Sequence, residues 1–267
     1  MAKSKETVTR TVIVALVLSV FFSVIVSTAA VTLKPLQVKN QNLNIKTNIL
    51  SAADMLPQGA SPEQIEEVFS RFEVRLVNLK TGQYVEPGYV GVEEPMKYDM
   101  YKAASNPELS TDIPADEDRA GIRRRPDVAK VYILRENGEL KKVVLPIHGY
   151  GLWSTLYGFI SLKGDANTIE GLGFYQHAET PGLGGEVDNP RWKAQWEGKV
   201  VYGEDMTEPQ IRLVKGGVNE NTRNREHKVD ALSGATLTSR GVESLVNYWL
   251  GDRGYAHYLK NLRQGEV

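Results

Sequence analysis

The segment from Asp230 to Ser239 concentrates side chains that can do chemistry. It reads Asp-Ala-Leu-Ser-Gly-Ala-Thr-Leu-Thr-Ser and runs into an apolar stretch with helical spacing. Free backbone N–H groups at a helix start and the helix dipole both favour a phosphate or another anion. The plainer alternative is that one hydroxyl, on Ser233 or Thr236, caps the helix. No Walker-type lysine follows, so a nucleoside triphosphatase is not indicated.

A second polar cluster runs from His177 to Gly185 and reads His-Ala-Glu-Thr-Pro-Gly-Leu-Gly-Gly. An imidazole, the Glu179 carboxylate and the Thr180 hydroxyl stand beside glycines, so backbone N–H groups can converge there on a polar ligand. A metal site needs more ligands than these, and the other histidines lack ligand spacing, so we expect no metal. For a lone histidine a structural role is the usual alternative, but the cluster favours a binding role.

A third segment, Gly-Tyr-Gly-Leu-Trp-Ser at residues 149–154, follows a predicted strand. Its glycines allow a backbone to approach a ligand closely, and Trp153 can stack on a planar ring. A tight strand connection with a core tryptophan explains the same residues. Taken alone, this segment is weak support for a site.

The first two segments resemble the signatures of a known family. Residues 230–239 resemble the flavinylation motif D-x-x-[ST]-G-A-T, whose last threonine accepts FMN through a phosphodiester made by an exported flavin transferase. Residues 177–184 are similar to the second signature of the same FMN-binding domain family. With the N-terminal apolar segment and the pair Trp192 and Trp196, the chain resembles the NqrC family of Na+-translocating NADH:quinone reductases. The RnfG family of Rnf-type ferredoxin:NAD complexes shares both motifs and is the alternative.

This resemblance implies FMN bound covalently to Thr236, with no catalytic residue in the chain itself. It implies a set of cofactor-binding residues drawn from both motifs, to which Trp153 and, more loosely, Tyr157 are added from their position in the sequence. The motif residues are Ser233, Gly234, Ala235, Leu237, Thr238, His177, Glu179, Thr180, Gly182, Leu183 and Gly184.

The resemblance also implies a role and partners. The chain would carry electrons as one subunit of a membrane complex that takes electrons from NADH to quinone and exports sodium. Its expected partners are the other subunits of that complex, the flavin transferase and the membrane. The NADH, quinone and sodium sites would then belong to the partner subunits, because nothing in this chain marks such a route.

Two other classes of function stay open at this level. A hydrolase would use Ser233 or Thr236 as a nucleophile and His177 as its base, which requires hydrogen-bond contact between the two. A membrane-tethered binding module would use the same fold without a cofactor. Bound flavin distinguishes both classes from the flavin carrier.

Composition sets the outer limits. The chain has 267 residues, of which 41% are hydrophobic and 24% charged, with a formal net charge of −1. This is an ordinary folded composition, long enough for one large or two small domains. The balanced charge gives no general argument for nucleic-acid binding. The chain has no cysteine, which excludes disulfides, thiolate metal sites and a cysteine nucleophile.

The stretch from Thr11 to Leu33 carries no charge. As a helix it would extend about 35 Å, enough for a bilayer core of about 30 Å. The alternative is a cleavable signal peptide with Lys3, Lys5 and Arg10 as its positive region. Both interpretations leave the N-terminus in the cytoplasm and the rest across the membrane. We therefore expect a bacterial inner-membrane protein with a single span.

These patterns predict the domain order. We expect a cytoplasmic N-terminus over residues 1–10, a transmembrane helix over 11–33, a connecting stalk over 34–60 and a periplasmic FMN-binding domain over 61–267. Residues 86–127 are expected to form a polar insert, with Arg123 to Arg125 in a solvated loop rather than an anion site.

Within the domain, Ser61 and Gln64 predict a capping box at the start of a short helix. Asn137-Gly138 predicts a hairpin between two strands. Further strands are expected at residues 157–162, 168–177, 199–202 and 210–214, and a helix at 237–250. The fold class is α+β, a mainly antiparallel sheet with flanking helices.

Overall fold

The computed structural model describes residues 7–204, 206 and 208–267. Lys3 and Lys5, part of the positive region that the sequence predicts before the apolar stretch, therefore lie outside the described residues. The chain divides into two units, residues 1–44 and residues 45–267, and each is described by itself.

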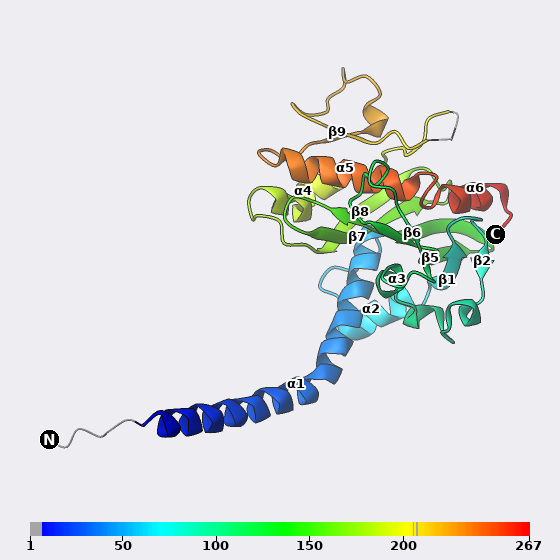
Figure 1. The fold of residues 1–267 in the computed structure, drawn as a ribbon. Helices are drawn as coiled ribbons and strands as arrows, with labels where there is room; N and C mark the ends of the chain where they lie inside the picture. The colour runs from blue at the N-terminus through cyan, green and yellow to red at the C-terminus, as the bar shows by residue number, and fades with distance from the viewer. Residues whose placement is uncertain (1–6, 205, 207) are drawn as a thin grey trace. The chain divides into compact units, whose positions relative to one another are not determined.

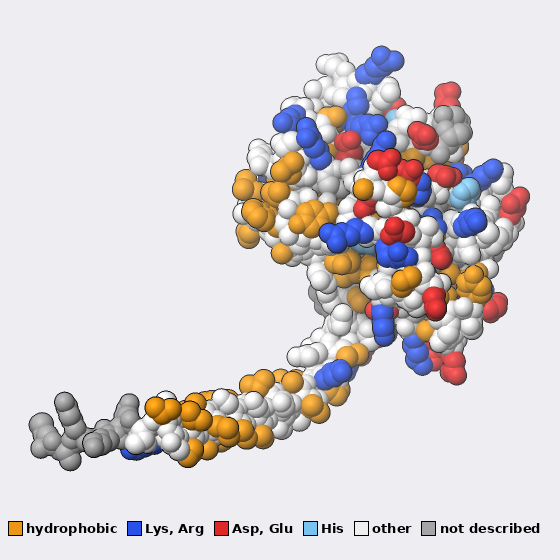
Figure 2. Space-filling model, in the orientation of Figure 1, with side chains coloured by type: hydrophobic (Ala, Val, Ile, Leu, Met, Phe, Trp, Pro, Cys, Tyr) orange, Lys and Arg blue, Asp and Glu red, His pale blue; other side chains and the backbone are white. Residues whose placement is uncertain are grey.

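Helix α1 runs from Val8 to Ala52. Its residues up to Asn44 belong to the first unit, and the remainder belongs to the second. The helix passes through Pro35 and includes most of the segment expected to be a stalk, because no further proline or glycine follows until Pro57. By its length and composition, α1 is the one helix among the described residues that could cross a membrane. Figure 2 shows apolar side chains along it, and the large apolar side chains from Val8 to Val38 are exposed, whereas Ile49 and Leu50 are buried.

The second unit is built on a six-stranded antiparallel sheet with the order β2-β1-β5-β6-β7-β8 (Figure 1). The turn between β5 and β6 has positive φ at Asn137 (53°) and Gly138 (82°), as a type I′ hairpin requires. The α+β class and the Asn-Gly hairpin are thus confirmed. The strands are β1 (Glu73–Asn78), β2 (Tyr84–Val85), β5 (Val128–Glu136), β6 (Glu139–Tyr150), β7 (Thr155–Lys163) and β8 (Ile169–Gln176).

Two small strand pairs lie outside this sheet. Strands β3 (Ser110–Asp112) and β4 (Arg124–Pro126) pair antiparallel, whereas β9 (Arg212–Val214) and β10 (Lys228–Asp230) pair parallel. The strand expected at residues 199–202 is wrong. Val200 bridges to Thr168 and donates its N–H to Glu226, while Tyr202 bridges to Pro209. Single contacts to different partners cannot form a ladder.

The insert at residues 86–127 is folded rather than a plain solvated loop. It contains η1 (Pro87–Val90), η2 (Pro95–Lys97), α3 (Met100–Ala104) and the β3–β4 pair. Arg124 donates to the Ser110 carbonyl at 2.9 Å, and Arg125 donates to the Arg253 carbonyl at 2.6 Å. These arginines therefore bind the chain itself and fasten the insert.

Helices cover both faces of the sheet (Figure 1). One face carries α5 (Thr236–Leu250), whose buried residues Val242, Leu245 and Trp249 share a core with β6, and α6 (Ala256–Gln264) follows it. The other face carries α2 (Pro62–Phe69), which begins with the predicted Ser61–Gln64 capping box. Its Phe69 ring packs against Tyr132 of β5. The short helices η3 (Gly184–Asp188), α4 (Pro190–Lys193), η4 (Ala194–Trp196) and η5 (Arg225–His227) complete the unit.

The second half of β6 lacks β5 as a neighbour, because their pairing ends at Tyr132 and Val144. Side chains in α5 and just after it supply donors there. The Trp249 indole N–H donates to the His148 carbonyl at 2.6 Å, and the Tyr255 hydroxyl donates to the Pro146 carbonyl at 2.8 Å. Because these groups are buried, the aromatic donors satisfy carbonyls that would otherwise be costly.

We predict that Tyr255→Phe lowers the free energy of unfolding of the globular unit by about 1–3 kcal/mol, because the Pro146 carbonyl loses its buried donor. Urea titration of the detergent-solubilised chain, followed by near-ultraviolet circular dichroism, measures this. The control is Tyr84→Phe, which removes a half-buried hydroxyl contact to Tyr258 and should cost less than about 1 kcal/mol. Equal losses in both variants would contradict the prediction.

Candidate functional site

The three polar segments of the sequence meet at the side chain of Glu179. Its Oε1 atom accepts the backbone N–H groups of Leu152 and Trp153, both at 3.0 Å, and of Ser154 at 3.4 Å. Its Oε2 atom accepts the hydroxyl of Thr238, in the first turn of α5, at 2.6 Å. One carboxylate therefore joins the loop after β6, the loop after β8 and the start of α5.

Glu179 is only 5% exposed, yet it carries a charge. Burial raises the pKa of its carboxyl, but the hydrogen bonds from Thr238 and from the backbone of Trp153, Leu152 and Ser154 outweigh this. The net pKa lies below the ordinary value. The carboxylate is therefore ionised at neutral pH, and its oxygens face protein donors.

His177 supports this arrangement from the same loop. Its Nδ1 atom accepts the Glu179 backbone N–H at 3.2 Å, and its Nε2 atom donates to Asp188 at 2.8 Å. With both nitrogens engaged, the ring has no free lone pair to take a proton from Ser233 or Thr236. This geometry counts against the hydrolase alternative, which needs His177 as a base.

The start of α5 has an unusual set of free groups. The N-cap residue is Ala235, with no side-chain cap, so the expected alternative of a Ser233 or Thr236 cap is wrong. Ser239 donates to the Ala235 carbonyl, and Thr238 donates to Glu179. Within the described chain, neither the hydroxyls of Ser233 and Thr236 nor the backbone N–H groups of residues 236–238 have a partner. Thr236 is therefore a free hydroxyl in an uncapped first turn.

Apolar side chains stand exposed around this turn. Exposed fractions are 36% for Leu152, 63% for Trp153, 45% for Leu183 and 53% for Leu237. Leu183 lies against Gly234, where an added Cβ would be 3.0 Å from its Cδ2 atom. Figure 2 shows hydrophobic side chains gathered at the edge of the globular unit, over the loops beside α4. Such a cluster is typical of a surface that is covered in function.

The other sequence-predicted residues take defined places. Gly184 packs so closely on the Glu179–Thr238 pair that an added Cβ would lie 2.6 Å from the Thr238 hydroxyl. Thr180 is exposed, and its carbonyl accepts the N–H groups of Leu183 and Gly185. Gly182, at φ +75°, lies in the same turn.

The structure corrects one expectation and adds two residues. Tyr157, suggested for the flavin wall, stacks instead on the buried His148 ring at 5.7 Å between centroids. Sequence reasoning missed Leu152, although it adjoins Trp153, and Asp188, the partner of His177. No local pattern marked Asp188, because its role depends on how the loop folds.

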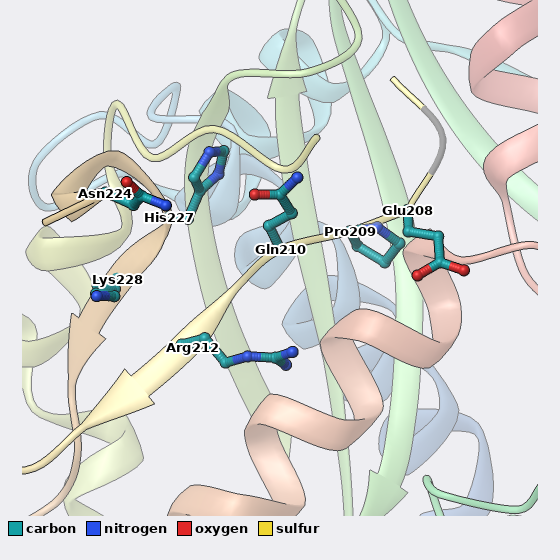
Figure 3. Close-up of a pocket in the computed structure, with 7 residues that line it drawn as sticks. All are labelled: Glu208, Pro209, Gln210, Arg212, Asn224, His227 and Lys228. Carbon is teal, nitrogen blue, oxygen red and sulfur yellow. The ribbon is translucent and has the colours of Figure 1, made fainter. Parts of the chain in front are cut away.

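A separate polar hollow lies beside β9 and β10 (Figure 3). Arg212 extends from β9 toward α5, where it pairs with Glu243, and Lys228 donates to the Arg223 carbonyl. The His227 ring contacts the Val200 carbonyl through Nδ1 at 2.6 Å. The cationic side chains that line this hollow thus already have partners in the chain. None of the three polar segments contributes to its lining.

Comparisons with known proteins bear on this site. Residues 151–251 match a family described as FMN-binding domain. The chain is 46% identical to the NqrC subunit of the Na+-translocating NADH-quinone reductase of Pseudomonas aeruginosa, with 99% of both chains covered, and 42% identical to its counterpart in Vibrio campbellii, again with 99% covered. The chain belongs to the NqrC family. The sequence preference for NqrC over RnfG is thereby confirmed.

A solved structure agrees with this assignment. The crystal structure of Shewanella oneidensis NqrC superposes with a TM-score of 0.73 at 36% identity, covering 82% of this chain and 96% of that chain. As a member of the NqrC family, the chain is a subunit of the translocase for which its relatives are named. The FMN-binding domain match contains the Glu179 loop, Thr236 and most of the third segment.

We predict that Glu179 makes stability depend on pH. Because its folded-state pKa is lowered, its stabilising contribution is complete above the ordinary value of 4.5 and is lost as pH falls through the folded-state pKa. The difference in free energy of unfolding between the native chain and Glu179→Gln should therefore shrink at acid pH. Urea titrations across pH 3–7 (roughly the range in which carboxyls titrate) measure this. A constant difference would contradict it.

Proposed function

We propose that the chain holds FMN covalently through a phosphodiester on Thr236 and carries electrons within a membrane NADH:quinone reductase complex that exports sodium. The observation that supports this best is the free Thr236 hydroxyl in an uncapped helix start. Family membership and the FMN-binding domain match agree with it. Bound FMN would supply one- and two-electron transfer.

The residues fit the phosphate of such a group. The unpartnered N–H groups of residues 236–238 are donors for a phosphodiester, which keeps one negative charge. The positive end of the α5 dipole favours the same charge. Gly234, at φ +72° and exposed, leaves room beside Thr236 for the flavin transferase that we expect to make the linkage.

The surrounding surface fits the ring system. An isoalloxazine needs an apolar or aromatic wall, and the exposed side chains of Leu152, Trp153, Leu183 and Leu237 offer one at the surface. Glu179 and His177 support this wall structurally, because their polar atoms bind other groups of the chain. We therefore expect backbone groups of the Thr180–Gly184 turn, rather than the Glu179 carboxylate, to meet the polar edge of the ring.

The subunit would transfer electrons between neighbouring redox subunits without an active site of its own. Helix α1 would anchor it as the single transmembrane segment, with residues 1–10 in the cytoplasm and the domain from residue 61 in the periplasm. A periplasmic location suits a linkage made by an exported transferase. The other subunits of the complex would supply the NADH, quinone and sodium sites.

We predict that Thr236→Ala abolishes covalent FMN while leaving the fold intact, because the variant removes the attachment oxygen and no existing hydrogen bond. Intact mass of the membrane-expressed chain, made together with the transferase, should increase by one FMN less one water in the native chain alone. Thr236→Ser keeps an attachment oxygen at the same position and is the matched control, which should still gain FMN. Absence of added mass in the native chain would refute the flavin-carrier function and favour a cofactor-free binding module.

We predict that the globular unit faces the periplasm. Because the chain has no cysteine, one introduced thiol reports one position. In intact cells a membrane-impermeant maleimide should label Glu220→Cys, at an exposed loop position, and should label Thr7→Cys only after lysis. The reverse pattern would invert the proposed orientation.

A further inference from the structure

Glu179 connects two parts of the site that are far apart in the sequence. On one side it binds three consecutive backbone N–H groups, which fixes the turn that presents Leu152 and Trp153. On the other side it binds Thr238, two residues after Thr236 on α5. Removal of either contact would release the apolar wall from the attachment residue.

The packing around the carboxylate leaves no room for another arrangement. An added Cβ at Gly151 would lie 2.6 Å from Oε1, and one at Gly184 would lie 2.7 Å from Oε2. At distances this short, a larger residue at either position would have to push the Glu179 carboxylate away from its donors. The two glycines thus let the loops close on Glu179 from both sides.

Thr238 also holds the first turn of α5 in place of a conventional cap. The N-cap residue Ala235 has no side chain that can accept a hydrogen bond, and the first turn of a helix frays readily without one. Ser239 stabilises this turn locally through the Ala235 carbonyl and the Leu232 N–H. The Glu179–Thr238 bond adds what Ser239 does not supply, a connection from the helix to the Leu152–Ser154 turn.

From this geometry we infer that Glu179 is a positioning residue for flavin attachment. Acting through Thr238, it holds Thr236 and the Leu152–Trp153 part of the wall in the mutual arrangement in which the transferase can join FMN to the chain. It does not contact the flavin itself. This inference rests on the proposed covalent attachment and names the group that makes Thr236 competent for it.

Thr238→Val tests the inference, because it keeps the shape of the side chain and removes the hydroxyl. Loss of a hydrogen bond to a charged group should lower the equilibrium population of the competent arrangement by about tenfold or more. The rate of attachment should fall by the same factor. Thr238→Ser keeps the hydroxyl and should restore the native rate. Both rates are measured as the fraction of chain that carries FMN, by intact mass, at successive times after coexpression with the transferase begins.

A stability control separates positioning from general destabilisation. Tyr255→Phe is expected to weaken the same unit while leaving the Glu179 contacts intact, so it should gain FMN at the native rate. Glu179→Gln is the second test variant, and it should slow attachment as Thr238→Val does. Visible circular dichroism of the attached flavin should change in both slow variants but not in Tyr255→Phe.

Native-rate attachment in Thr238→Val would overturn the positioning role while leaving the FMN proposal in place. Equal slowing in Thr238→Ser and Thr238→Val would also overturn it, since the hydroxyl would then not matter. If Thr238→Val fails to fold, Glu179→Gln compared with Tyr255→Phe decides the question. No FMN on the native chain would instead refute the proposed function.

Discussion

The close packing of α5 against the end of β6 is the constraint on which the site depends. A Cβ at Gly149 of β6 would lie 2.5 Å from the Cβ of Leu245, and a Cβ at Gly241 of α5 would lie 2.5 Å from the Tyr150 carbonyl. Helix and strand therefore approach so closely that an added Cβ at either glycine would clash. Because α5 starts at Thr236, this contact brings the first turn of the helix to the end of β6, within reach of the loops that Glu179 connects.

A buried carboxylate is costly unless donors surround it. Glu179 has no lysine or arginine partner among the described residues, and uncharged N–H and O–H groups offset its burial instead. This choice has a consequence nearby. Because no cation of the described chain neutralises Glu179 directly, its charge is balanced by hydrogen bonds alone, and the unpaired N–H groups at the start of α5 remain available to an anion.

Local patterns predicted much of the fold, and contacts between distant residues account for the rest. The hairpin at Asn137-Gly138 depends on backbone conformations that few residues adopt, so the sequence alone identifies it. The bridge of Val200 to Thr168 depends on which segments lie beside each other in the fold, and no local pattern records that. The site divides in the same way. Its motifs could be found from residue types, but the inward orientation of Glu179 required the position of Thr238, 59 residues away.

The exposure of the apolar wall makes sense if a covalent bond retains the cofactor. A flavin held without one needs a pocket that buries most of its surface. Here the wall residues are 36–63% exposed, so contact area alone would hold a ring weakly. A bond to Thr236 would prevent dissociation of the flavin, and the ring could then lie at the surface, open to neighbouring redox groups. The membrane helix serves the same end, because tethering in a shared membrane raises the effective concentration of each partner without a deep interface.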